Sequence, residues 1–261
     1  MPSFWEIQRV QSSGDLLDDM STYASLPNEP GTRPGVIVVQ EVFGVNKHIQ
    51  SVADRFAASG YFAVAPALFH REGTTEEIRG TNPVFGYGDA PDAEARGRAV
   101  ANLRDEDVIL DINTTIEWLK KHPRVAGDRI GIVGFCAGGR ITYLAAAACQ
   151  GISVAAVFYG GNIMKPWGDG PTPFERTPSI GCPVMGNFGD LDANPTVDDL
   201  EKIESELKKC GKTYDFKMYR GAGHGFFCDE RDSYHEASAK DAWNRTLGWF
   251  QNHLSPVAAK A

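Results

Sequence analysis

The sequence lacks several features that mark whole classes of protein. It has no apolar run near the roughly 20 residues that span a bilayer, and even the weakly polar stretch Ile141–Cys149 is far shorter. Glu6 and Arg9 fall where a signal peptide would need an apolar core. The five cysteines are an odd number, are widely spaced and form no CxxC pair, which argues against a disulfide framework or a zinc knuckle. We therefore expect a protein without a membrane segment, in a reducing cytoplasm.

Positive charge is also in short supply. The chain has 26 Lys and Arg against 34 Asp and Glu, a net charge of -8, so neither nucleic acid nor an anionic membrane is an expected partner. Hydrophobic residues make up 42% and charged residues 23%, which excludes disorder, collagen and coiled coil. We find no internal repeat and no linker-like shift in composition. The 261 residues therefore predict one large α/β domain over residues 1–261.

Short apolar runs alternate with longer helical patterns along the chain. The predicted strands are Val36–Gln40, Tyr61–Ala65, Arg129–Val133, Val154–Tyr159, Pro183–Phe188 and Tyr214–Tyr219. The predicted helices are Lys47–Ser59, a helical region over Pro91–His122, Ala137–Cys149, a helix with Pro195 in its first turn that ends near Cys210, and Tyr234–His253. In the N-terminal segment 1–30, Phe4–Gln11 and Ser21–Ser25 predict an antiparallel edge. Residues 67–90 predict an irregular loop near the site.

This alternation predicts an α/β fold with a mostly parallel sheet and helices on both faces. Active sites in such sheets lie at the carboxyl ends of the strands. One residue in such a place is Cys136, in the G-x-C-x-G sequence Gly134–Gly138 between a predicted strand and a small-residue helix. A nucleophile on such a sharp turn needs small neighbours, and the helix N-terminus favours its thiolate form. The other reading is a buried cysteine in a glycine-rich turn.

A thiol nucleophile needs a base and a group that orients the base. His224 lies in a glycine-rich loop after a predicted strand, whereas His235 and His253 lie in helical pattern. Asp190 and Asp192 both follow the strand Pro183–Phe188, and we favour Asp192. The order Cys, Asp, His, with each residue at a strand end, is that of the α/β-hydrolases.

Several motifs in this order make the sequence similar to the dienelactone hydrolase family. They are Gln40–Gly44, Gly60–Pro66, Gly134–Gly139, Phe188–Asp192 and Gly223–Phe226. The resemblance covers residues 34–253. It implies the α/β-hydrolase fold, a Cys-Asp-His triad on Cys136, Asp192 and His224, and cleavage of an enol-lactone.

The resemblance also implies roles for residues around the triad. Glu41 would approach the resting thiol and help it become a thiolate when substrate binds. The backbone N–H groups of Ala137 and Val42 would form the oxyanion hole. Phe43, Tyr159 and Phe226 either wall the substrate pocket or are ordinary core.

The chain departs from the family pattern at one position. Members that act on dienelactone carry an arginine four residues after the catalytic histidine, where this sequence has Cys228. A second family arginine lies upstream of the nucleophile, and Arg79, Arg96 and Arg98 are in range; we assign Arg96 to substrate binding. A carboxylate-bearing substrate without a bidentate cation would bind more weakly.

These residues predict a carboxylic-ester hydrolase that works through a thioester acyl-enzyme on a small lactone or ester, without a metal or other cofactor. An alternative keeps the triad but acts on a broader carboxylester, a thioester or a phosphotriester. A third possibility is a catalytically silent thiol sensor or ligand-binding module. The expected oligomeric state is a monomer or a small homo-oligomer.

Overall fold

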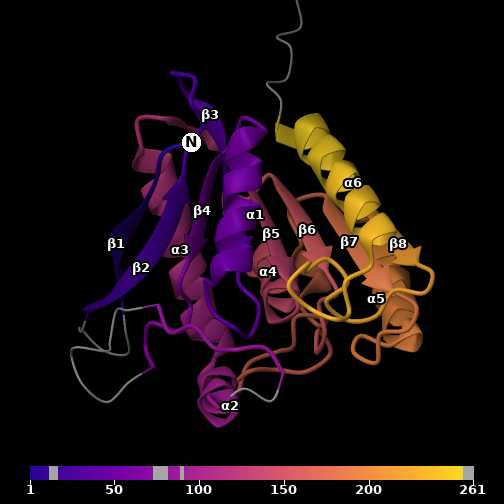
Figure 1. The fold of residues 1–261 in the computed structure, drawn as a ribbon. Coiled ribbons are helices and arrows are strands. Elements are labelled where there is room, and N and C mark those ends of the chain that lie inside the picture. Colours follow the sequence, from indigo (N-terminus) through magenta and orange to yellow (C-terminus); the bar gives the residue numbers. More distant parts are fainter. Residues whose placement is uncertain (12–16, 73–81, 89–90, 255–261) are drawn as a thin grey trace, which may run out of the picture.

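Eight strands of the described chain form one mixed sheet in the order β1-β2-β4-β3-β5-β6-β7-β8 (Figure 1). The computed structural model describes residues 1–11, 17–72, 82–88 and 91–254. The strands are β1 Ser3–Gln11, β2 Leu17–Ser25, β3 Arg33–Val39, β4 Phe62–Pro66, β5 Val125–Phe135, β6 Val154–Phe158, β7 Val184–Gly189 and β8 Tyr214–Tyr219. From β4 to β8 in this order the strands are parallel, and the hairpin β1–β2 adds an antiparallel edge.

Helices cover both faces of the sheet. In Figure 1, α1 (Lys47–Ala58) and α6 (Glu236–Leu254) lie in front of it, and α3 (Asp105–Lys121) and α4 (Ala137–Ala148) lie behind. The helix α5 (Val197–Lys209) contributes Leu200, Ile203 and Leu207 to the same core cluster as α3 and α4. The short helix α2 (Ala93–Asn102) lies at the lower end of the molecule in this view. The predicted mostly parallel sheet with helices on both faces is confirmed.

The central strands are apolar without interruption because both of their faces are buried. In β3, Ile37 and Val39 pack into the cluster under α3 and α4, whereas Val36 and Val38 pack into the cluster under α1 and α6. All four side chains are fully buried. A strand covered on both sides reads as a continuous hydrophobic run rather than as an alternation.

The predicted helical region 91–122 is helical over most of its length, but it is not continuous. It forms two helices, α2 and α3, with extended backbone at Leu103 and Arg104 between them. The backbone N–H of Asp105 donates to the carbonyl of Trp167, and its carboxylate binds Arg140. These hydrogen bonds to distant residues separate α2 from α3. The local sequence pattern does not indicate such a break.

Two other boundaries also differ from the prediction. Strand β5 begins at Val125 rather than Arg129, because a bulge lets its first residues pair with Arg33 and Pro34 of β3. Helix α5 begins at Val197, so Pro195 lies outside it. A reciprocal capping box starts this helix: the Thr196 hydroxyl accepts from the Asp199 N–H, and the Asp199 carboxylate accepts from the Thr196 N–H.

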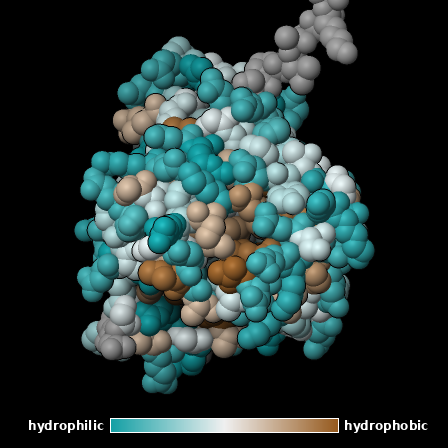
Figure 2. All heavy atoms as spheres, turned by 90° about the vertical axis from the view of Figure 1, so that its right-hand side faces the viewer, coloured by the Kyte–Doolittle hydropathy of each residue, from teal (hydrophilic) through white to brown (hydrophobic). Residues whose placement is uncertain are grey.

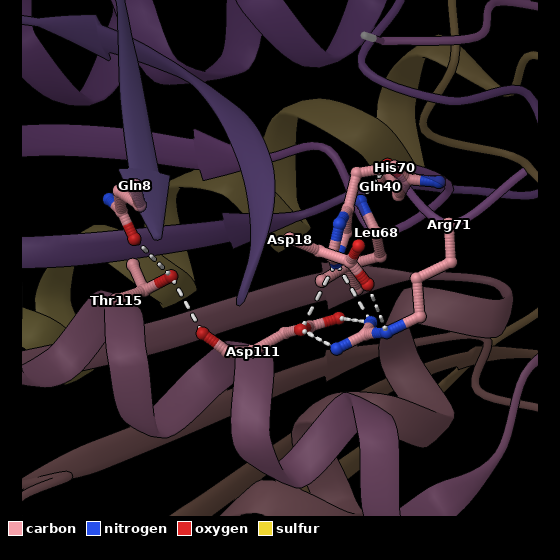
Figure 3. A network of polar contacts seen from close by, with 8 residues as sticks. All are labelled: Gln8, Asp18, Gln40, Leu68, His70, Arg71, Asp111 and Thr115. Atoms are coloured by element: carbon pink, nitrogen blue, oxygen red, sulfur yellow. Dashed lines mark hydrogen bonds and ion pairs between the residues drawn. The ribbon is translucent and has the colours of Figure 1, made fainter. Parts of the chain in front are cut away.

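A buried polar network joins the edge of the sheet to α3 (Figure 3). The Asp111 carboxylate, which is fully buried, accepts hydrogen bonds of 2.7 Å from both terminal nitrogens of Arg71 and lies 3.2 Å from His70. Thr115, one turn further along α3, donates to Gln8 of β1. This network attaches the segment after β4 and the N-terminal hairpin to the same helix.

Asp111→Ala should lower the free energy of unfolding by about 3 kcal/mol, since it leaves the Arg71 charge without its buried partner. Chemical denaturation of the two proteins measures this difference. Glu236→Ala, which breaks an exposed ion pair with Lys240, is the control and should leave stability unchanged. Equal stabilities of Asp111→Ala and the original chain would contradict this role of the network.

Candidate active site

Cys136 occupies a strained turn between β5 and α4. Its φ and ψ are 57° and -118°, in a region that residues with side chains rarely adopt. The two flanking glycines make this turn possible. A Cβ on Gly134 would lie 2.1 Å from the carbonyl oxygen of Gly138, and a Cβ on Gly138 would lie 2.4 Å from that of Val39. The G-x-C-x-G spacing is thus required by close backbone contact, which packs the start of α4 against the end of β3.

Asp192 and His224 come to the same cavity as Cys136 from two further strand ends. Asp192 follows β7 and His224 follows β8. The Asp192 Oδ2 atom lies 2.8 Å from Nδ1 of His224, and its Oδ1 accepts a hydrogen bond from the N–H of Asn194. Cys136 and His224 line the same cavity, and Cys136 is among the groups that raise the pKa of His224. The structure therefore brings the three predicted triad residues together in the order Cys, His, Asp.

The surroundings of His224 favour its charged form. Burial works against the charge, but the hydrogen bond to Asp192 and the nearby Cys136 side chain outweigh it and raise the pKa of His224 to about 10. An imidazolium between a carboxylate and a thiol is the arrangement that stabilises a thiolate. The competing candidate Asp190 instead accepts a hydrogen bond of 2.7 Å from the N–H of Gly221, where it supports the turn before the histidine loop.

A cavity of about 480 Å³ opens beside Cys136 and His224. Its lining residues are Val42, Val100, Cys136, Ala137, Gly161, Asn162, Trp167, Leu191, Asp192, Ala193, Asn194 and His224. Among these described residues there is no lysine or arginine. Both predicted oxyanion-hole residues, Ala137 at the start of α4 and Val42 after β3, line the cavity next to the thiol. The face shown in Figure 2 is mostly polar, with hydrophobic surface gathered beside a hollow in its lower half.

The predicted substrate-binding residues lie around the cavity but not among its lining residues. Tyr159 is fully buried and packs edge-on against His224, and Phe226 packs in turn against Tyr159. Arg96 lies over the ring of Phe43 and donates to the carbonyls of Gly86 and Gly88. Arg98 pairs with Glu94 on the surface of α2, and Arg79 lies outside the described residues.

Glu41 is held in a tight turn after β3, bridged to Gly44. A Cβ at Gly44 would lie 2.1 Å from the carbonyl oxygen of Pro83, so the segment 82–88 packs directly onto this turn. The Glu41 carboxyl is buried, and burial raises its pKa although Arg231 and His224 oppose this. Arg231 lies 3.5 Å from one Glu41 oxygen. The sequence did not predict this contact, because its position in the loop after His224 was the only indication that Arg231 lies near the site.

A second missed element is the buried ion pair behind the cavity wall. Arg140 of α4 is fully buried and binds Asp105 through two hydrogen bonds of 2.6 and 3.0 Å. It also donates to the carbonyl of Asn162 and lies 3.9 Å from the ring centre of Trp167, and both of these residues line the cavity. The sequence did contain a signal for this ion pair. Arg140 is the single arginine in a helix of small and apolar residues, and a buried cation requires a partner.

The model of the dienelactone hydrolase family matches residues 20–254. The chain belongs to the dienelactone hydrolase family. A "Putative carboxymethylenebutenolidase" of Synechocystis sp. is 36% identical over 235 residues, which cover 89% of this chain and 91% of that protein. A "Probable 2-oxo-3-(5-oxofuran-2-ylidene)propanoate lactonase" of Bradyrhizobium sp. is 32% identical over 236 residues and covers 89% of each chain.

Solved structures give the same assignment. A "Putative Dienelactone Hydrolase" from Klebsiella pneumoniae has a TM-score of 0.79 at 34% identity, covering 96% of this chain and 99% of that one. The predicted family, the α/β-hydrolase fold and the class of carboxylic-ester hydrolase are thereby confirmed. No helix among the described residues is long and apolar enough to span a bilayer.

Asp192→Asn should lower the pKa of His224, because the carboxylate that stabilises the imidazolium is replaced by a neutral amide. Histidine titration by NMR measures the shift. The raised pKa contributes stability that is complete below about pH 6.5 and is lost as the pH rises through about 10, so the variant's stability deficit should shrink over that range. Asp190→Asn is the matched control, and an unchanged pKa in Asp192→Asn would refute the assignment.

Proposed function

We propose that this protein hydrolyses small lactones or esters through a thioester on Cys136, with His224 as the base and Asp192 as the group that orients it. The observation that carries the proposal is the convergence of these side chains, from three separate strand ends, at one cavity. The similarity to the dienelactone hydrolase family supports the same reading and points to an enol-lactone or a related activated ester.

The reaction follows from the positions of these groups. The Cys136 thiolate attacks the carbonyl carbon, and the N–H groups of Ala137 and Val42 stabilise the negative charge that develops on the oxygen. The carbon–oxygen bond to the leaving group then breaks, which leaves the acyl group on sulfur. An enolate leaves readily and takes its proton from the His224 imidazolium, so that His224 becomes neutral. His224 next removes a proton from water, which attacks the thioester and releases the acid and the thiolate.

Glu41 is a second candidate acceptor for the thiol proton. Its carboxyl lies in the apolar interior close to His224 and Arg231, where burial disfavours a negative charge. A carboxylate there can take up a proton readily when another negative charge forms nearby. In this proposal Glu41 accepts the Cys136 proton as substrate binds, and the thiolate is generated only in the occupied site.

The cavity favours substrates whose acyl part carries no charge. Cys228 stands where a family arginine would bind a carboxylate, and Arg96 is engaged with backbone carbonyls. The described lining offers apolar surface from Val42, Val100 and Trp167. A substrate carboxylate placed there would lose its water without gaining a lysine or arginine partner in return, which is unfavourable. We propose neutral lactones and esters as the preferred class.

Incubation with p-nitrophenyl acetate tests the nucleophile directly. The intact mass should show a transient acetyl adduct on the protein, and Cys136→Ala should show none while hydrolysis falls about 1,000-fold or more. Asp190→Asn serves as the control with normal turnover. A protein that folds and keeps its thiol but cleaves no ester would favour a thiol sensor, and adduct formation by Cys136→Ala would place the nucleophile elsewhere.

A pair of enol esters, alike except that one carries a carboxylate, tests the substrate class. The neutral ester should have a kcat/KM about tenfold or more above that of the charged one, a difference of about 1.4 kcal/mol. Leu191→Arg adds a cation at the exposed rim of the cavity and should narrow this preference. Leu191→Gln is the uncharged control. Faster cleavage of the carboxylate ester by the original chain would overturn the proposed class.

A further inference from the structure

Three buried side chains that can bind metal meet beside the active site. They are Glu41 in the turn after β3, His48 in the first turn of α1, and Cys228 in the loop after β8. One ligand atom from each residue lies within 4.8 Å of the other two. Their relative exposures are 1%, 4% and 0%, so all three are shielded from water. None of the proposed catalytic steps uses His48 or Cys228.

Several polar atoms of this cluster make no hydrogen bond within the described chain. Both oxygens of Glu41 and the Nε2 atom of His48 are in this state. The nearest opposite charges are at longer range: Arg231 is 3.5 Å from Glu41, and Asp229 is 3.7 Å from Nδ1 of His48. Polar atoms without a partner in the interior are uncommon and unfavourable. The cluster is therefore chemically suited to an occupant that accepts electron pairs.

We propose that Glu41, His48 and Cys228 form a binding site for a Zn²⁺-like ion. Oxygen, nitrogen and thiolate sulfur are the three kinds of ligand that zinc accepts, whereas calcium and magnesium require oxygen. Tetrahedral bonds of 2.0 to 2.3 Å place zinc ligands about 3.3 to 3.8 Å apart, so the cluster must contract by about 1 Å. The charges of thiolate and carboxylate balance the ion.

Binding requires the sulfur to lose its proton and the ion to reach a buried position. The Cys228 thiol, whose pKa burial raises to about 11, releases its proton to solvent as the sulfur–metal bond forms. Tyr87 is half-buried and its hydroxyl accepts from the Cys228 thiol at 3.5 Å, so an ion that enters on this side must displace this side chain. Arg231 is partly exposed and can turn away from Glu41 into solvent when the ion replaces its charge.

The site has a consequence that rests on the proposed function. An ion bound to Glu41 withdraws the carboxylate that we propose as acceptor of the Cys136 proton. Its positive charge also lies close to His224, which interacts with the charge of Glu41. Occupation of the site should therefore slow ester hydrolysis. The site is inhibitory in this proposal and supplies no group to the reaction.

Titration of the full chain with Co²⁺ tests the site, because a Co²⁺–thiolate bond gives a strong absorption in the near ultraviolet. The experiment uses a Cys136→Ser background, so that the active-site thiol cannot contribute. We expect binding of one ion with this absorption, its loss in Cys228→Ser, and weakening of roughly 100-fold or more in His48→Gln. Cys182→Ser is the matched control, since Cys182 is buried in the core away from the cluster.

Two outcomes would contradict the proposed metal site. One is the absence of stoichiometric Co²⁺ binding, in which case water would be the occupant of the cluster. The other is a Co²⁺–thiolate absorption that persists in Cys228→Ser. His48→Gln keeps the test decisive if Cys228→Ser fails to fold. Zn²⁺ should also inhibit the original chain more strongly than His48→Gln, each measured against its own metal-free rate. If the metal-free protein cleaves no ester, the proposed function fails, whereas the Co²⁺ titration still decides the metal site.

Discussion

The contact between the start of α4 and the end of β3 is the constraint on which the site depends. At Gly138 there is no room for even a Cβ, because the carbonyls of Val39 and Gln40 lie against it. This close contact accommodates the strained backbone conformation of Cys136. It also brings the residues after β3 next to the Cys136 thiol. Glu41 and Val42 therefore lie near Cys136, although it is almost one hundred residues away in the sequence. A backbone contact thus determines the chemistry of the site.

Buried charges perform a related task around this contact. Arg140 and Asp105 connect α4 to the loop that carries Asn162 and Trp167, and so position one wall of the cavity. Asp111 and Arg71 attach the segment after β4 to α3 (Figure 3). Such pairs contribute little net stability when they are intact, but they are costly to break because an unpaired charge is left behind. Their role here is to make one arrangement of the loops strongly preferred.

The region of Glu41 differs from the triad in its physical character. Asp192 and His224 have their partners at 2.8 Å, and their charges are mutually satisfied. Glu41 has a cation at 3.5 Å but no hydrogen bond in the described chain, and it is clustered with His48 and Cys228. A carboxyl in this condition responds to whatever charge comes near it. The proposed proton transfer from Cys136 and the proposed binding of a metal ion would both use this property, and each would exclude the other.

The sequence alone determined the features that depend on local pattern. Continuous apolar runs identified the parallel strands, and the glycines around Cys136 identified the turn, since both reflect constraints within a few residues. The sequence also predicted that Cys136, Asp192 and His224 would meet. Each of them follows a predicted strand, and the ends of parallel strands meet at one edge of a sheet. Tertiary structure decided the break between α2 and α3, the choice of Asp192 over Asp190 and the meeting of Glu41, His48 and Cys228. These depend on distances between segments far apart in the chain, which side-chain packing determines and local patterns do not encode.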